Sequence, residues 1–177
     1  MNTFINILLL AVIASFFAVQ DVHTEERPMN KLQITSPVFP HNGMIPSKFT
    51  CDGADVSPTL SIAGIPENTR SLALIVDDPD APAGTWVHWV VWNIGAGTKE
   101  IPEGSVPHGA IQGKNDFGKQ GYGGPCPPSG THRYNFKLYA LDASIALKSG
   151  ATKAQIEEAM KGHVLAKAEL IGLYRRK

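Results

Sequence analysis

Short apolar or alternating runs recur along the middle of the chain, and Pro, Gly and Asp residues separate them. Runs of this length that are bounded by turn residues are typical of β-strands. They cover residues 32–39, 59–65, 71–78, 86–94 and 133–142. The pattern predicts a mainly β domain that begins near Leu32.

Two of these runs are rich in Val, Ile, Leu and Trp, which favours buried strands over helices. Because side chains alternate along a strand, the second run should present two different faces. One face is predicted to hold Trp86, His88, Val90 and Trp92, and the other Val87, Trp89, Val91 and Asn93. We expect both faces to be covered.

The hydrophobic period changes near the end of the chain. Thr152 and Gln155 are spaced as in a capping box, which marks the start of a helix. Residues at near-helical spacing then follow at Ile156, Met160, His163, Lys167, Leu170 and Tyr174. The pattern predicts a C-terminal helix that is interrupted by Gly162, with His163 as a packing or surface residue.

The N-terminal part differs from the rest. Residues 4–19 carry no charge and are too few to span a bilayer comfortably, so we interpret residues 1–20 as a secretory leader. An uncleaved anchor is the alternative. Residues 21–31 are polar and aperiodic, as in a linker, and residues 32–177 are expected to form a single domain without a spanning segment. The protein would be periplasmic or secreted.

Composition narrows the function classes. Lys plus Arg and Asp plus Glu each number 16, so no broad field favours nucleic acid or an anionic membrane. Any recognition of an anion must be local.

Export would place Cys51 and Cys126 in an oxidising compartment, where such a pair favours a disulfide. Two buried free thiols are the alternative.

The first candidate for chemistry is an acidic segment that directly follows a predicted buried strand. Asp78 lies there directly before Pro79, and Asp80 lies between Pro79 and Pro82, so the two prolines stiffen the loop. An acidic turn that only caps the strand is the alternative.

His88 is the second candidate, because a buried imidazole needs partners for two ring nitrogens, and Asp78 could be one of them. A core histidine satisfied by backbone is its alternative.

The third candidate is the long segment 112–134, which is rich in Gly and Pro but also contains aromatic residues. Long loops in small domains are often functional, and Gly-rich backbone can form a nest of N–H groups for an anion. His132 then opens a strand. By alternation His132 and Tyr134 share a face, while Arg133 points away and is expected to form a structural ion pair.

Three motifs occur together in this order: DPDAP at 78–82, WVHW at 86–89 and GPCPPSGTHRY at 124–134. With FTCDGADVSP and NDFGKQGYGGPCPP they make the chain resemble the phosphatidylethanolamine-binding protein family, in its bacterial, Raf-kinase-inhibitor-like branch. The resemblance covers residues 32–174. It implies two antiparallel sheets with a few peripheral helices, and a small pocket for phosphate or a similar anion.

The resemblance also implies roles for individual residues. Ligand-binding roles fall on Asp78, Trp86, His88, Gly124, His132 and Tyr134, and supporting roles on Asp80, Pro82 and Pro125. In this interpretation Asp78 orients a histidine and a charged His88 or His132 attracts the anion, helped by backbone N–H groups. Affinity should then rise as pH falls through about 6.5. No cofactor is implied.

Two other functions remain open at this stage. Asp78, His88 and His132 could serve a hydrolase or a metal-dependent enzyme, although no Gly-x-Ser-x-Gly nucleophile motif is present and the histidines lack local metal-ligand spacing. The chain could instead be a protein-interaction module, such as an inhibitor of a kinase or a protease. We expect a small anionic ligand, with a protein partner as a further possibility.

Overall fold

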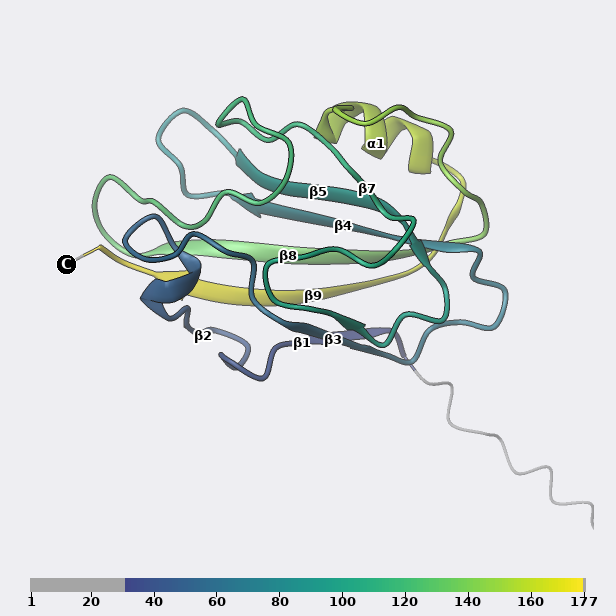
Figure 1. Cartoon of the computed structure of the whole chain (residues 1–177), viewed down its shortest axis with the longest axis horizontal. Coiled ribbons are helices and arrows are strands. Elements are labelled where there is room, and N and C mark those ends of the chain that lie inside the picture. Colours follow the sequence, from purple (N-terminus) through teal and green to yellow (C-terminus); the bar gives the residue numbers. More distant parts are fainter. Residues whose placement is uncertain (1–30, 177) are drawn as a thin grey trace, which may run out of the picture.

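The computed structural model describes residues 31–176, and this part of the chain is built around two β-sheets (Figure 1). The larger sheet has the order β2-β9-β8-β4-β5-β7 and the smaller β1-β3-β6. Neighbouring strands are antiparallel except for β2 and β9, which pair in parallel. The predicted mainly β fold is confirmed. The strands are β1 (Gln33–Thr35), β2 (Gly43–Met44), β3 (Leu60–Ala63), β4 (Ser71–Asp78), β5 (Trp86–Gly95), β6 (Glu100–Ile101), β7 (Ile111–Gln112), β8 (His132–Leu141) and β9 (Val164–Tyr174), and the helices are the 3₁₀ turn η1 (Ser47–Phe49) and α1 (Lys153–Met160).

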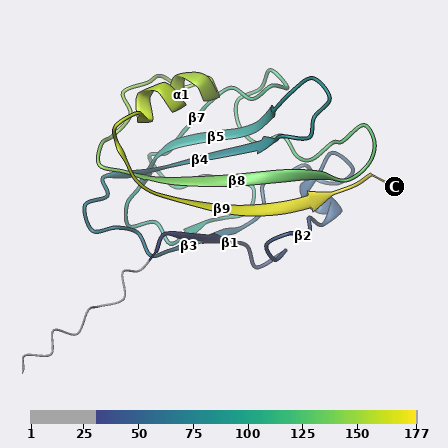
Figure 2. The same cartoon turned by 180° about the vertical axis from the view of Figure 1, so that it is seen from behind.

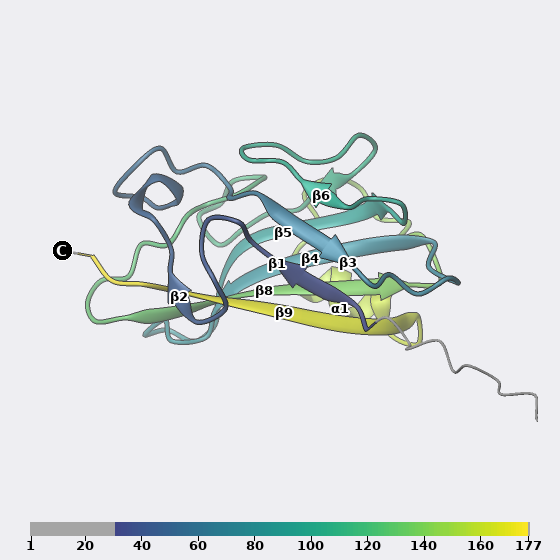
Figure 3. The ribbon, with the colours of Figure 1, turned by 90° about the horizontal axis from the view of Figure 1, so that it is seen from below.

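Apolar side chains form two cores, one on each face of the larger sheet. Viewed from below, β1 and β3 lie across this sheet (Figure 3), and their residues Ile34 and Leu60 belong to the core between the sheets. On the opposite face α1 lies near β5 and β7 (Figure 2), and its residues Ile156 and Met160 belong to the second core. This three-layer arrangement covers both faces of the central strands.

β4 is the central strand of the larger sheet. It pairs with β5 on one side and with β8 on the other, and all eight of its residues are buried. A strand covered on both faces needs apolar residues throughout, which explains the continuous run that predicted it.

A β-bulge interrupts β5 at His88. Asp77 pairs with Val87 and Val76 pairs with Trp89, so that His88 is an extra residue opposite β4. An extra residue of this kind bends a strand and changes the direction of the side chains beside it. The bulge therefore lets His88 and Trp89 face the same side of the larger sheet.

The predicted alternation of faces holds from Trp89 to Trp92, but the predicted grouping of residues across the bulge is wrong. Trp89 lies in the core between the sheets, whereas Val87 and Val90 lie in the core beneath α1. His88 contacts Tyr134 of the core between the sheets, with ring centroids 5.1 Å apart. The prediction had grouped Val87 with Trp89 and His88 with Val90, because a strict period of two cannot include an inserted residue.

The C-terminal helix is confirmed only in its first part. The Thr152 side chain accepts a hydrogen bond from the Gln155 backbone, and the helix ends at Met160. The extension to Tyr174 is wrong, because residues 164–174 form the long strand β9. At Gly172 a Cβ atom would lie 2.6 Å from the Ile45 side chain, so close packing against this strand requires glycine.

The predicted leader, residues 1–20, lies outside the described residues, and so does the predicted linker, residues 21–31, apart from its last residue. Within residues 31–176, no helix is both long and apolar enough to cross a bilayer. Among the described residues the first strand, β1, begins at Gln33.

Asp77 joins α1 to the larger sheet. Its buried carboxylate accepts hydrogen bonds from Lys137 Nζ of β8, at 2.8 and 2.9 Å, and from Lys153 Nζ at the start of α1, at 2.6 Å. A buried carboxylate requires such partners, because desolvation of an unpaired charge is very unfavourable. The contact fixes α1 over the second core.

We expect Asp77→Asn to lower the free energy of unfolding by about 2–4 kcal/mol, because both ammonium groups lose their charged partner in a buried position. Urea denaturation measures this change. Glu158→Gln is the matched control, since its pair with Lys161 is exposed and should contribute about 0.5 kcal/mol or less. Equal losses in the two variants would contradict the anchoring role of Asp77.

Candidate functional site

A cavity of about 180 Å³ lies at one end of the larger sheet. β4 ends there, and β5 and β8 begin there, because these neighbouring strands are antiparallel. The polar residues of its lining are Asp78, His88 and His132. The remaining lining residues are Ala81, Pro82, Trp86, Phe117, Cys126, Pro127 and Pro128. Residues far apart in sequence thus meet in one cavity.

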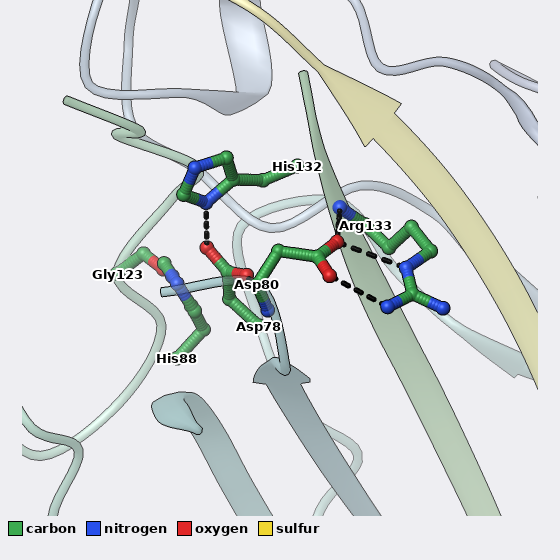
Figure 4. Close-up of polar contacts among 6 residues, drawn as sticks. All are labelled: Asp78, Asp80, His88, Gly123, His132 and Arg133. Carbon is green, nitrogen blue, oxygen red and sulfur yellow. Dashed lines mark hydrogen bonds and ion pairs between the residues drawn. The ribbon is translucent and has the colours of Figure 1, made fainter. Parts of the chain in front are cut away.

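Asp78 orients His132 across the cavity. The Asp78 Oδ2 atom lies 2.7 Å from His132 Nδ1 (Figure 4), and both residues are buried. The other carboxylate oxygen accepts a hydrogen bond from the Asp80 backbone N–H at 2.8 Å. Because an ionised carboxylate only accepts hydrogen bonds, His132 carries a proton on Nδ1 and its Nε2 is the nitrogen left for a ligand.

The backbone of Gly123 fixes His88 on the opposite wall (Figure 4). Its N–H donates to the His88 carbonyl oxygen at 3.0 Å, and its own carbonyl oxygen lies 2.6 Å from His88 Nδ1. A carbonyl only accepts, so Nδ1 carries a proton here too, and Nε2 is again the nitrogen left over. A Cβ on Gly123 would lie 2.6 Å from the Phe117 ring, so this close approach needs glycine.

Burial lowers the pKa of His88 below the ordinary value of 6.5, even though the hydrogen bond to Gly123 and the charge of Asp78 act in the opposite direction. Desolvation disfavours the charged imidazolium. The neutral ring therefore persists to lower pH than in a solvent-exposed histidine. Near neutral pH its Nε2 carries a lone pair and accepts hydrogen bonds.

Asp80 and Arg133 form a second pair beside the cavity (Figure 4). Asp80 Oδ2 accepts from the backbone N–H and from Nε of Arg133, both at 2.9 Å, and Oδ1 accepts from the guanidinium at 2.5 Å. These hydrogen bonds hold the pKa of Asp80 at about 2. The predicted structural ion pair of Arg133 is confirmed, and it holds the acidic segment against the start of β8.

Two buried donors beside the cavity have no hydrogen-bond partner within residues 31–176. They are the Trp86 Nε1–H and the Tyr134 hydroxyl. Burial, and then the charge of Asp78, raise the pKa of Tyr134, so the hydroxyl stays protonated. Buried polar groups without partners are rare in folded proteins and often mark functional positions. Tyr134 lies behind His88 rather than on the surface of the cavity.

The glycine-rich loop, which lies within residues 112–134, does not point the N–H groups of Gly123 and Gly124 at the cavity as the sequence suggested. The Gly124 N–H donates to the Asp55 side chain at 2.6 Å, and that of Gly123 is used by His88. Gly124 and Pro125 stand outside the lining. A disulfide between Cys51 and Cys126, with Cα atoms 5.4 Å apart, fixes the loop instead.

The structure brings together most of the predicted ligand-binding residues. Asp78, Trp86, His88, His132 and Pro82 line one cavity. Sequence reasoning did not assign Phe117, whose ring packs edge-on against Trp86 and His88 at centroid distances of 5.4 and 5.3 Å. An aromatic residue within a glycine-rich loop was the available signal. No group of three or more potential metal ligands is found within residues 31–176.

The fold and the cavity define a member of a known family. A family model described as phosphatidylethanolamine-binding protein matches residues 35–175, and the chain belongs to that family. The UPF0098 protein of Methanothermobacter thermautotrophicus is 53% identical over 150 residues, which cover 82% of this chain and 99% of that protein. The UPF0098 protein of Pyrococcus horikoshii is also 53% identical, over 80% of this chain and 76% of its own length.

Two crystal structures have the same fold. A phosphatidylethanolamine-binding protein homologue from Chlamydia trachomatis has a TM-score of 0.81 and 43% identity, over 84% of this chain and 99% of its own. YbcL of E. coli, described as a new member of the mammalian family, has a TM-score of 0.78 and 36% identity, over 83% of this chain and 99% of its own. The resemblance to the bacterial branch is confirmed.

The lowered pKa of His88 predicts how stability depends on pH. Below pH 6.5 the unfolded chain protonates this imidazole while the folded chain resists, so the free energy of unfolding falls as pH decreases through this window. His88→Asn retains a donor for the Gly123 carbonyl but does not titrate. We therefore expect the stability difference between wild type and variant to shift against the wild type on acidification from about pH 7.5 to about pH 5. Urea unfolding at several pH values measures it, and a pH-independent difference would contradict the assignment.

Proposed function

We propose that this protein binds a phosphate monoester or an anion of similar size in the cavity between His88 and His132, and does not catalyse a reaction. One observation carries the proposal. Each of the two imidazoles uses Nδ1 to contact the protein, at 2.6 and 2.7 Å, which leaves the two Nε2 atoms for a ligand. The two rings line a single cavity of about 180 Å³. This volume is well below the roughly 300–1,000 Å³ of drug-sized pockets and suits a small group.

Binding of an anion at this site requires a proton. Asp78 brings one negative charge, and a neutral imidazole offers only a lone pair at Nε2. An anionic oxygen can approach Nε2 if the ring takes up a proton, or if the ligand itself is protonated on that oxygen. Because the pKa of His88 is lowered by burial, its protonation in the complex depends on the charge of the ligand. Affinity should consequently increase as pH falls.

The surroundings of the cavity support a ligand that has both a charged and an apolar part. Within residues 31–176 the buried Trp86 Nε1–H is a donor without a hydrogen-bond partner, and Trp86 lines the cavity. Pro82, Phe117 and Pro127 give the lining an apolar side. An organic phosphate, such as the headgroup end of a lipid or a free monoester, combines these two properties.

The lining favours binding over catalysis. Among the described residues that line the cavity, the only sulfur belongs to Cys126, which is bonded to Cys51, and no Ser or Thr is present. The pair of Asp78 and His132 has the geometry of a general base, but no Ser, Thr or free Cys among the described lining residues could serve as the nucleophile that such a pair activates. Capture of a protein partner, as in an inhibitor, would use the rim of the same cavity and is our second candidate, favoured by the exposed ring of Phe117.

We further propose that the domain works in an oxidising compartment, the periplasm or the exterior. The bond between Cys51 and Cys126 supports this location, because structural disulfides persist mainly in secreted and periplasmic proteins. The uncharged run at residues 4–19 is consistent with export.

Isothermal titration with methyl phosphate and methyl sulfate tests the proposed site. Methyl sulfate does not titrate near neutral pH, so a rise in its affinity between about pH 8 and about pH 5 belongs to the protein. Measurements in two buffers of different ionisation enthalpy should show proton uptake on binding. His132→Asn retains a donor for Asp78 but lacks Nε2, and should weaken binding about tenfold or more, the factor expected for one charge-assisted hydrogen bond.

His163→Asn is the matched control. His163 also places Nδ1 beside an aspartate, Asp142, at 2.8 Å, but both side chains are about half exposed and lie outside the cavity. This variant should bind both esters as the wild type does. Equal affinities in all three proteins, or binding without proton uptake and independent of pH, would contradict the proposed function.

A further inference from the structure

A second cavity, of about 210 Å³, lies on the same side of the larger sheet. It is bounded by the loop before β3, the turn after β6, the strand β5 with its edge neighbour β7, and the glycine-rich loop. The side chains that matter for its chemistry are Asp55, Ser57, Trp89, Ser105, Gln112 and Tyr122. None of these residues lines the first cavity.

The bulge in β5 places the two cavities next to each other. His88 and Trp89 follow one another in sequence, but the bulge turns both toward the core between the sheets, so His88 lines the first cavity and Trp89 the second. The glycine-rich loop forms the wall between them. On the side of the first cavity, Gly123 forms two hydrogen bonds with His88. On the side of the second, the Gly124 N–H donates a hydrogen bond to Asp55 Oδ1 at 2.6 Å.

The lining of the second cavity carries negative charge. Asp55 is the one charged side chain among the described residues that line it, and no Lys, Arg or His accompanies it there. Desolvation, and then the charge of Asp55, raise the pKa of Tyr122, so this charge reaches the ring beside the cavity. The nearby Glu103 is paired with Lys48. A phosphate would be repelled at this site, whereas a cation would be attracted.

Both aromatic residues have their polar atoms engaged elsewhere. The Trp89 Nε1–H donates to Gln112 Oε1 at 2.8 Å, and the Tyr122 hydroxyl donates to the Phe49 carbonyl oxygen at 2.9 Å. Their rings pack edge to face with centroids 5.5 Å apart. The rings therefore contribute π surface rather than hydrogen-bond donors, and ring faces attract cations.

We propose that the second cavity binds a small organic ammonium ion. The second oxygen of the Asp55 carboxylate accepts a hydrogen bond from the ammonium group, and the hydroxyl groups of Ser57 and Ser105 offer further acceptors. The rings of Trp89 and Tyr122 contact the carbon atoms beside the charge. A cavity of this volume admits a ligand of only a few heavy atoms.

A titration of the ¹⁵N-labelled protein with n-propylammonium chloride, followed by NMR, tests this proposal. We expect saturable shifts of the Trp89 indole N–H and of the Gly121 and Tyr122 amides. n-Propanol and sodium propionate have the same chain without the positive charge, and they should cause no saturable shift at these positions. Methyl phosphate binding is not required for this result, so the two sites are tested separately.

Asp55→Asn is the critical variant, because it removes the charge and preserves the local structure. Asp55 has a φ of 54°, which asparagine adopts readily, and the amide oxygen can still accept from the Gly124 N–H. We expect this variant to bind n-propylammonium about tenfold more weakly or worse, the factor expected for a lost charge-assisted hydrogen bond. Asp142→Asn, which removes an exposed charge elsewhere, should leave the affinity unchanged.

A second variant separates the cavity from a surface attraction. Ser105→Phe places a ring in the exposed turn at the cavity mouth and should abolish the saturable shifts while the remaining spectrum stays native. The proposal is overturned if n-propylammonium gives no saturable shift. It is equally overturned if n-propanol binds as well, or if Asp55→Asn binds like the wild type.

Discussion

The inserted residue in β5 is the feature on which the site depends. Because His88 is inserted opposite β4, His88 and Trp89 both face the core between the sheets, whereas successive residues of a regular strand face opposite sides. Two hydrogen bonds to Gly123 hold His88 in place. Because one of these bonds is made by Nδ1, the position of the proton on the ring follows from the backbone of the loop. Strand geometry and ligand chemistry are thus linked at one residue.

Asp77 and Asp78 show how one strand serves both faces of a sheet. Successive side chains alternate, so Asp77 points toward α1 and holds two lysines, while Asp78 points toward the cavity and holds His132. Both carboxylates are buried, and each has partners that compensate for its desolvation. The first stabilises the layer of α1 and the second defines the tautomer of His132. The fold places the chain in its family. The contacts of Asp78 and His132 are the basis for the proposed ligand.

The sequence predicted the strands β1, β3, β4, β5 and β8 and most of the cavity, because runs bounded by turn residues and the motifs around Asp78 and His132 are local signals. It could not predict the bulge, since no residue type marks the insertion at His88. It also failed at β9, where Leu170 and Tyr174 are four residues apart. Four residues are about one helical turn and also two repeats of a strand, so that spacing did not discriminate between them. The partner of the Gly124 N–H, Asp55, depends on a contact across 69 residues that no local pattern contains.

The positions of the imidazole protons test the central claim most directly. The ¹⁵N chemical shifts of the histidine rings distinguish Nδ1 from Nε2 protonation in the intact protein. The account predicts that His88 and His132 carry a proton on Nδ1 near neutral pH, that Nε2 of His88 is unprotonated, and that saturation with methyl sulfate protonates at least one Nε2. The account would be contradicted if the His88 ring carried its proton on Nε2 and the ¹⁵N shifts of both rings did not respond to the anion.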